Sequence, residues 1–149
     1  RKIDGIQILA NTVDDRLGVI SFYHPDIHFN LFVKLLNDRF GIQTRGGCAC
    51  AGTYGHFLLE VSYDQSQEIT DKINHGDLSE KPGWVRWSLH PTMTDKEVAF
   101  ILEGIREVTK NHREWAKDYY HLSKQNEFIY HSHKEQQPED TITKDWFRL

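Results

Sequence analysis

Residues 84–89 of this chain read Trp-Val-Arg-Trp-Ser-Leu, the clearest strand pattern in the sequence. Apolar and polar side chains alternate along it, a period of two that predicts a β-strand. The alternation puts two sets of side chains on opposite faces: Val85, Trp87 and Leu89 on one, and Trp84, Arg86 and Ser88 on the other. The first face is expected to pack on a core, and the face with Arg86 is expected to be free to meet another surface.

Helices are predicted after this strand. Thr94 and Glu97 form a capping box, in which the hydroxyl and the carboxylate satisfy backbone N–H groups at a helix N-terminus. Apolar residues follow at helical spacing. Trp115, Tyr119 and Leu122 continue with a similar spacing and predict a further amphipathic helix.

Strands and a helix are also predicted before it. Residues 6–9 and 18–23 are apolar or β-branched and predict two strands, the second ended by a turn at residues 24–26. Apolar residues recur at helical spacing over 29–40, and Gly41 lies where a C-terminal cap belongs. Residues 42–45 are expected to be extended, and two short helical segments are expected between residues 54 and 75.

These elements together predict an α+β fold: a small, mostly antiparallel sheet covered on one face by helices. One domain is expected over residues 1–131, followed by a polar C-terminal tail over residues 132–149. The chain starts without a methionine, a cap or a turn, which predicts a domain cut from a longer protein.

Composition excludes several classes of function. A net charge of −4, with scattered basic residues, argues against nucleic-acid binding. No apolar run reaches the roughly 18 residues of a membrane span. The two cysteines are too close together for an unstrained disulfide. A reducing, cytoplasmic location is therefore expected.

Residues 44–52, Thr-Arg-Gly-Gly-Cys-Ala-Cys-Ala-Gly, form the most unusual stretch. Glycine and alanine make it permissive, and Arg45 would favour a thiolate at Cys48 or Cys50. The alternative is that both cysteines are small apolar residues packed in a tight turn. Cys48, Cys50 and His56 could also supply three zinc ligands, but the Cys-x-Cys spacing is too tight for the usual site, and no metal is predicted.

Arg86 is a second candidate for chemistry. Its guanidinium group could bind a carboxylate through two parallel hydrogen bonds, a geometry that lysine cannot offer. The alternative is an ordinary surface arginine on the polar side of a half-exposed strand.

Two segments resemble one known family. Residues 41–56 resemble the cysteine-bearing segment of class V aminotransferases, a group that includes cysteine desulfurases and selenocysteine lyases, and residues 83–94 resemble the family's later Arg-x-Ser-Leu strand. The resemblance covers roughly residues 5 to 125. It implies the C-terminal small domain of a fold-type I enzyme, beside a large domain that binds pyridoxal 5'-phosphate, in a homodimer.

The resemblance also implies residue roles. Arg86 matches the arginine that binds the α-carboxylate of the amino-acid substrate, and Arg45 matches a substrate-side arginine. Cys50 matches the desulfurase nucleophile, which takes up the substrate's sulfur and leaves alanine. The role of Cys48 stays open, and His56 is a further possible site residue.

The chain departs from the family pattern in two ways. Residues 54–81 form an insert that is longer than in compact desulfurases. The lysine that binds pyridoxal phosphate belongs to the large domain, so this chain is expected to hold no cofactor-binding residue and to be inactive alone. Two alternatives are kept: an aminotransferase that does not use the thiol, and a non-catalytic binding module.

Overall fold

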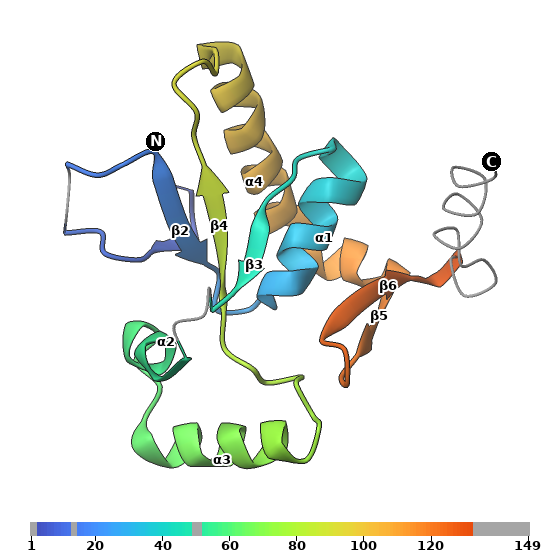
Figure 1. The fold of residues 1–149 in the computed structure, drawn as a ribbon. Helices are drawn as coiled ribbons and strands as arrows, with labels where there is room; N and C mark the ends of the chain where they lie inside the picture. Colours follow the sequence, from blue (N-terminus) through green and yellow to red (C-terminus); the bar gives the residue numbers. More distant parts are fainter. Residues whose placement is uncertain (1–2, 13–14, 49–51, 133–149) are drawn as a thin grey trace, which may run out of the picture.

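The computed structural model describes residues 3–12, 15–48 and 52–132, with the side chains of residues 52 and 53 left out. In this part of the chain, a four-stranded antiparallel sheet has the order β1-β2-β4-β3 (Figure 1). Its strands are β1 (Gln7–Ile8), β2 (Val19–Tyr23), β3 (Arg45–Gly47) and β4 (Trp84–Ser88). The strand predicted from residues 84–89 is thus an inner strand, and the α+β class is confirmed.

Two helices cover one face of the sheet. α1 (Phe29–Phe40) begins at His28 and ends at Gly41, whose φ of 66° is the left-handed conformation that glycine adopts without strain. α4 (Asp95–Trp115) begins with the predicted capping box of Thr94 and Glu97. The apolar face of the sheet packs against them, and the side chains with almost no exposure are Phe32, Leu35, Leu36, Val85 and Val108.

The predicted alternation of β4 is confirmed. Val85 and Trp87 belong to the core between sheet and helices, at 0% and 4% exposure. Trp84 is also buried, but it lies outside that core cluster, as expected for a side chain on the opposite face.

The insert between β3 and β4 is helical. α2 (Gly52–Leu58) and α3 (Tyr63–Asn74) lie at the bottom of the view in Figure 1, below the ends of β3 and β4. A capping box of Ser62 and Gln65 begins α3. An ideal Cβ on Gly55 would lie 3.4 Å from the ring of Trp84. α2 therefore covers the Trp84 end of the sheet face that carries Trp84 and Arg86, so this face is not entirely free.

The helix predicted through Trp115, Tyr119 and Leu122 is wrong. α4 ends at Trp115, and a short 3-10 turn, η1 (Ala116–Asp118), leads into a hairpin of β5 (Tyr119–Leu122) and β6 (Glu127–Tyr130). Contacts within the hairpin contribute to this outcome: the rings of Tyr119 and Tyr130 meet edge to face at 5.3 Å across it, and Asn126 adopts the positive φ that its turn requires.

The predicted boundary between domain and tail at residues 131 and 132 stays a prediction, because residues 133–149 lie outside the described part of the chain. Among the described residues, no helix combines the length and the apolarity needed to cross a bilayer.

Candidate functional site

Two arginines face the same way from neighbouring strands. β3 runs antiparallel to β4 with Arg45 directly opposite Arg86, and Ser21 of β2 lies opposite Arg86 on its other side. Directly opposed residues of antiparallel strands share a face of the sheet. The next position, Gly46, faces α1: a Cβ there would lie 2.9 Å from Oδ1 of Asn30. The alternation therefore directs both arginines away from α1.

Among the described residues, no acidic group compensates the positive charge of this pair. Neither Arg45 nor Arg86 forms an ion pair with a residue in the described ranges. The Nε atom of Arg86 is buried and has no hydrogen-bond partner within the same ranges. Opposed like charges and a buried donor without an acceptor both cost stability. An anion bound at this place would remove both costs.

The thiol of Cys48 follows directly on β3. Gly47, with a φ of 119°, ends the strand in a conformation that side chains rarely adopt, and Cys48 comes next as a half-buried free thiol. A pocket of about 210 Å³ opens beside it. Its lining residues are Cys48, His56, Ser66, Thr70, Ile73, Lys81 and Pro82.

His56 has a defined orientation in that pocket. Its Nδ1 lies 2.5 Å from the hydroxyl of Ser66, a contact between α2 and α3. The structure therefore brings together Cys48 and His56, two of the predicted site residues, with α3 supplying Ser66, which sequence reasoning missed. No signal in the sequence around Ser66 distinguishes it from an ordinary exposed helix residue.

The arginine pair and the pocket beside Cys48 both lie along the β3–β4 strand pair. Gly47 is opposite Trp84, so the backbone of Cys48 continues the same strand pair three residues beyond Arg45, about 10 Å at 3.3 Å per residue. Cys50, the predicted nucleophile, lies outside the described residues. The structure thus brings together Arg45 with Arg86, and Cys48 with His56, and the two pairs are neighbours.

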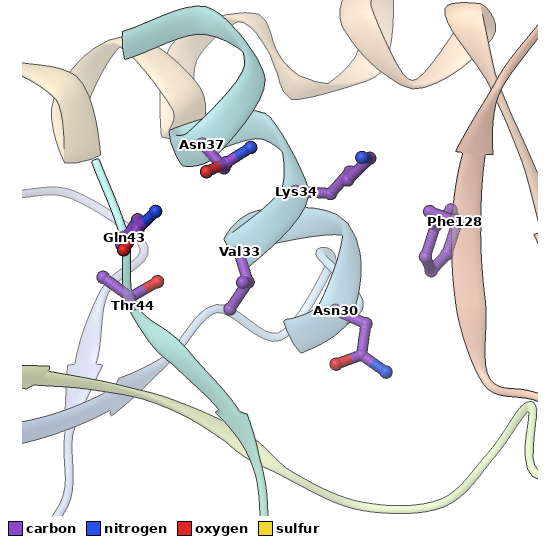
Figure 2. Close-up of a pocket in the computed structure, with 7 residues that line it drawn as sticks. All are labelled: Asn30, Val33, Lys34, Asn37, Gln43, Thr44 and Phe128. Carbon is purple, nitrogen blue, oxygen red and sulfur yellow. The ribbon is translucent and has the colours of Figure 1, made fainter. Parts of the chain in front are cut away.

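A groove along α1 was not predicted from the sequence. It has a volume of about 350 Å³ and lies along α1, between the segment that leads into β3 and Phe128 of β6 (Figure 2). The hydroxyl of Thr44 is buried there without a partner in the described chain. The other lining residues are Asn30, Val33, Lys34, Asn37 and Gln43. On the sequence these are unremarkable positions of a helix surface and a short connection, so only the packing creates the groove.

His28 was also missed. Its Nδ1 accepts the backbone N–H of Asn30 at 3.1 Å, so a neutral imidazole caps α1. The pKa of His28 is lowered to about 4, mainly by burial and next by the nearby His121, while the backbone of Ser79 has a smaller, opposing effect. Because an imidazole at an N-cap is less common than a hydroxyl or a carboxamide, the sequence carried no clear signal for it.

No three His, Cys, Asp or Glu side chains in the described part of the chain cluster as metal ligands. The zinc alternative includes Cys50, so this finding does not test it.

No protein-family model matches the chain. No curated protein matches its sequence. The site must therefore be judged from its own geometry.

Proposed function

We propose that this chain is the substrate-binding small domain of an enzyme that uses pyridoxal 5'-phosphate, of the class V aminotransferase and cysteine desulfurase kind. In this proposal Arg86, together with Arg45, binds the carboxylate of an amino-acid substrate. The observation that carries it is the pair of opposed arginines without an ion-pair partner among the described residues, one of them with a buried Nε that lacks an acceptor.

A carboxylate suits this place for two reasons. Guanidinium groups offer paired N–H donors that match the two carboxylate oxygens, and charge-assisted hydrogen bonds of this kind are stronger than neutral ones. A β-strand holds its side chains more rigidly than a loop does, which favours a binding residue whose task is to orient a substrate.

The cofactor would be bound mainly by a large domain of the same protein. When bound, pyridoxal phosphate supplies an electron sink for the amino acid. No residue of this chain is assigned to the cofactor itself. The fit rests on Arg86, whose buried Nε donor has no acceptor among the described residues and would suit the carboxylate of an amino-acid substrate. A homodimer and a cytoplasmic location belong to the same proposal.

Two reactions are possible within this proposal, and they differ in whether the thiol of Cys50 takes part. In a desulfurase or selenocysteine lyase, the thiolate of Cys50 takes up the substrate's sulfur or selenium, and alanine is left. In an aminotransferase the thiol is not used. The glycine and alanine content of residues 46–52 supports the first reaction, because such small residues would permit the close approach of a thiol to a substrate bound by the arginines.

Kinetics of the cofactor-loaded protein that contains this domain test the proposal. Arg86→Ala should raise the KM for the amino-acid substrate by roughly 10- to 100-fold, the loss of a charge-assisted contact of about 1.5–3 kcal/mol. Arg113→Ala, an exposed arginine of α4, is the matched control. An unchanged KM in Arg86→Ala would overturn the assignment. Cys50→Ala should abolish sulfide release from cysteine, and continued release would favour the aminotransferase.

The chain alone offers a second measurement, which needs no cofactor. In an NMR titration, L-alanine should shift the Nε–Hε resonance of Arg86. L-alaninamide, which lacks the carboxylate, should leave it in place. Equal shifts with both compounds would exclude carboxylate recognition.

A further inference from the structure

The α2–α3 unit, residues 52–80, exposes aromatic side chains. Tyr54 is 60% exposed, and Phe57 and Tyr63 are each 75% exposed. None of the 12 residues of α3 is buried. A helix of this length is marginal in water without tertiary packing, and exposed apolar patches commonly mark sites of protein interaction. The unit therefore presents a surface that the described part of the chain leaves uncovered.

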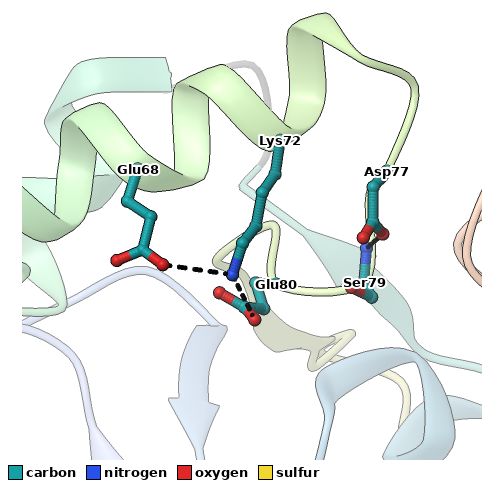
Figure 3. Close-up of polar contacts among 5 residues, drawn as sticks. All are labelled: Glu68, Lys72, Asp77, Ser79 and Glu80. Atoms are coloured by element: carbon teal, nitrogen blue, oxygen red, sulfur yellow. Dashed lines mark hydrogen bonds and ion pairs between the residues drawn. The ribbon is translucent and has the colours of Figure 1, made fainter.

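The net negative charge of the chain is concentrated in the same unit. It contains six carboxylates and one lysine, a net charge of −5, whereas the whole chain has −4 and the remainder is therefore slightly positive. Lys72 is held by Glu80 at 2.7 Å and by Glu68 at 3.4 Å (Figure 3). The carboxylates that remain are those of Glu60, Asp64, Asp71 and Asp77.

The exposed groups are held in place before any partner arrives. The rings of Tyr54 and Phe57 stack at 5.9 Å, and the hydroxyl of Tyr63 accepts a hydrogen bond from Gln67 at 2.7 Å. Ordered aromatic side chains lose little conformational freedom on binding, which makes them effective anchors.

We propose that the α2–α3 unit is a docking surface for a protein partner that presents a basic amphipathic helix, with lysine or arginine beside an apolar stripe. Apolar side chains of the partner would cover Tyr54, Phe57 and Tyr63, while its basic residues face the surrounding carboxylates. The proposal does not depend on the proposed enzymatic function.

Charge selects this partner among the alternatives. A second copy of the chain would oppose one unit of −5 to another, which is repulsive. Nucleic acids and anionic membranes would be repelled in the same way. A neutral apolar partner would form no ion pairs with the carboxylates clustered in this unit.

The test uses the full chain and two synthetic helical peptides with the same leucine stripe, one with lysine and one with glutamate on the polar face. Calorimetry should detect binding of the lysine peptide, weakened by added salt, and no binding of the glutamate peptide. Amide NMR shifts should concentrate in residues 54–74. No binding, or shifts centred on another surface, would overturn the proposal.

Variants separate the two contributions. Glu60→Gln, Asp64→Asn and Asp71→Asn, combined, should weaken the lysine peptide by about tenfold, as should Phe57→Ala alone. The matched control removes three exposed carboxylates elsewhere: Asp4→Asn, Asp15→Asn and Glu127→Gln. Equal weakening by the control would reduce the effect to overall charge and overturn the assignment of the surface. Circular dichroism checks that each variant is folded.

Discussion

At the scale of single residues, Arg45 and Arg86 oppose like charges across two strands. The pairing is unfavourable in the free chain, and the buried Nε of Arg86 adds to the cost. Residues that reduce stability while they prepare a binding site are typical of functional positions. Replacing one arginine of the pair should therefore raise stability and weaken binding at the same time.

Arg86→Met keeps an unbranched side chain that reaches as far as the position of Nε, but removes the charge and the unpaired donor. We expect the free energy of unfolding to rise by about 0.5–1 kcal/mol, because the repulsion with Arg45 disappears, while binding of the amino-acid carboxylate is lost. Urea unfolding of the free chain measures the first effect. Arg113→Met should change stability by less than about 0.5 kcal/mol. A less stable Arg86→Met protein would show that Arg86 has a structural partner.

At the scale of elements, the helices differ in how they are stabilised. α1 and α4 bury apolar stripes against the sheet, whereas α3 depends on its capping box and on contacts between exposed side chains. Elements with few buried apolar contacts open more easily than those in a core.

Amide hydrogen exchange should reveal this difference. The amides of α3 are expected to exchange at least about a hundredfold faster than those at the centre of α1, since opening α3 exposes no core residue. The basic peptide of the docking experiment should slow exchange in α3 and leave α1 unchanged. Equal protection of α1 and α3 in the free chain would contradict this view of α3.

Local sequence signals predicted some elements correctly and failed for one. The period-two alternation of residues 84–88 and the capping box at Thr94 are local signals, and both elements formed as predicted. The helical spacing of Trp115, Tyr119 and Leu122 predicted a helix, and that prediction is wrong. The hairpin formed because Tyr119 packs in the core and Asn126 accepts a side-chain hydrogen bond from Asn30, contacts that span most of the chain.

At the scale of the whole molecule, stability depends on half-buried histidines. His28 caps α1 as a neutral imidazole, and its ring contacts His121 and Phe128 of the hairpin. The pKa of His24 is lowered as well, mainly by burial and by the nearby His112. The folded state therefore disfavours protonation of the His24 and His28 rings.

We expect the chain to lose stability as the pH falls from about 6.5 toward 4. In that range the unfolded chain protonates His28, whose folded pKa is about 4, so protons favour unfolding. The loss should be about 1–2 kcal/mol, reduced from the full shift because the ring is partly exposed. Urea unfolding at pH 7 and pH 4.5 measures it. His28→Asn keeps a capping acceptor without titrating and should lose less, and an equal loss would assign the effect to other groups.

Local signals were enough to predict the alternation that forms β4 and the caps that begin α4 and end α1. The site residues Arg45, Arg86, Cys48, Cys50 and His56 were candidates on the sequence and stay a prediction. Three contacts could be seen only in the folded chain: Arg45 lies opposite Arg86, Ser66 contacts His56, and the hairpin packs on α1. The physical reason is that register and packing depend on contacts between distant segments, and neither periodicity nor capping encodes which segments meet.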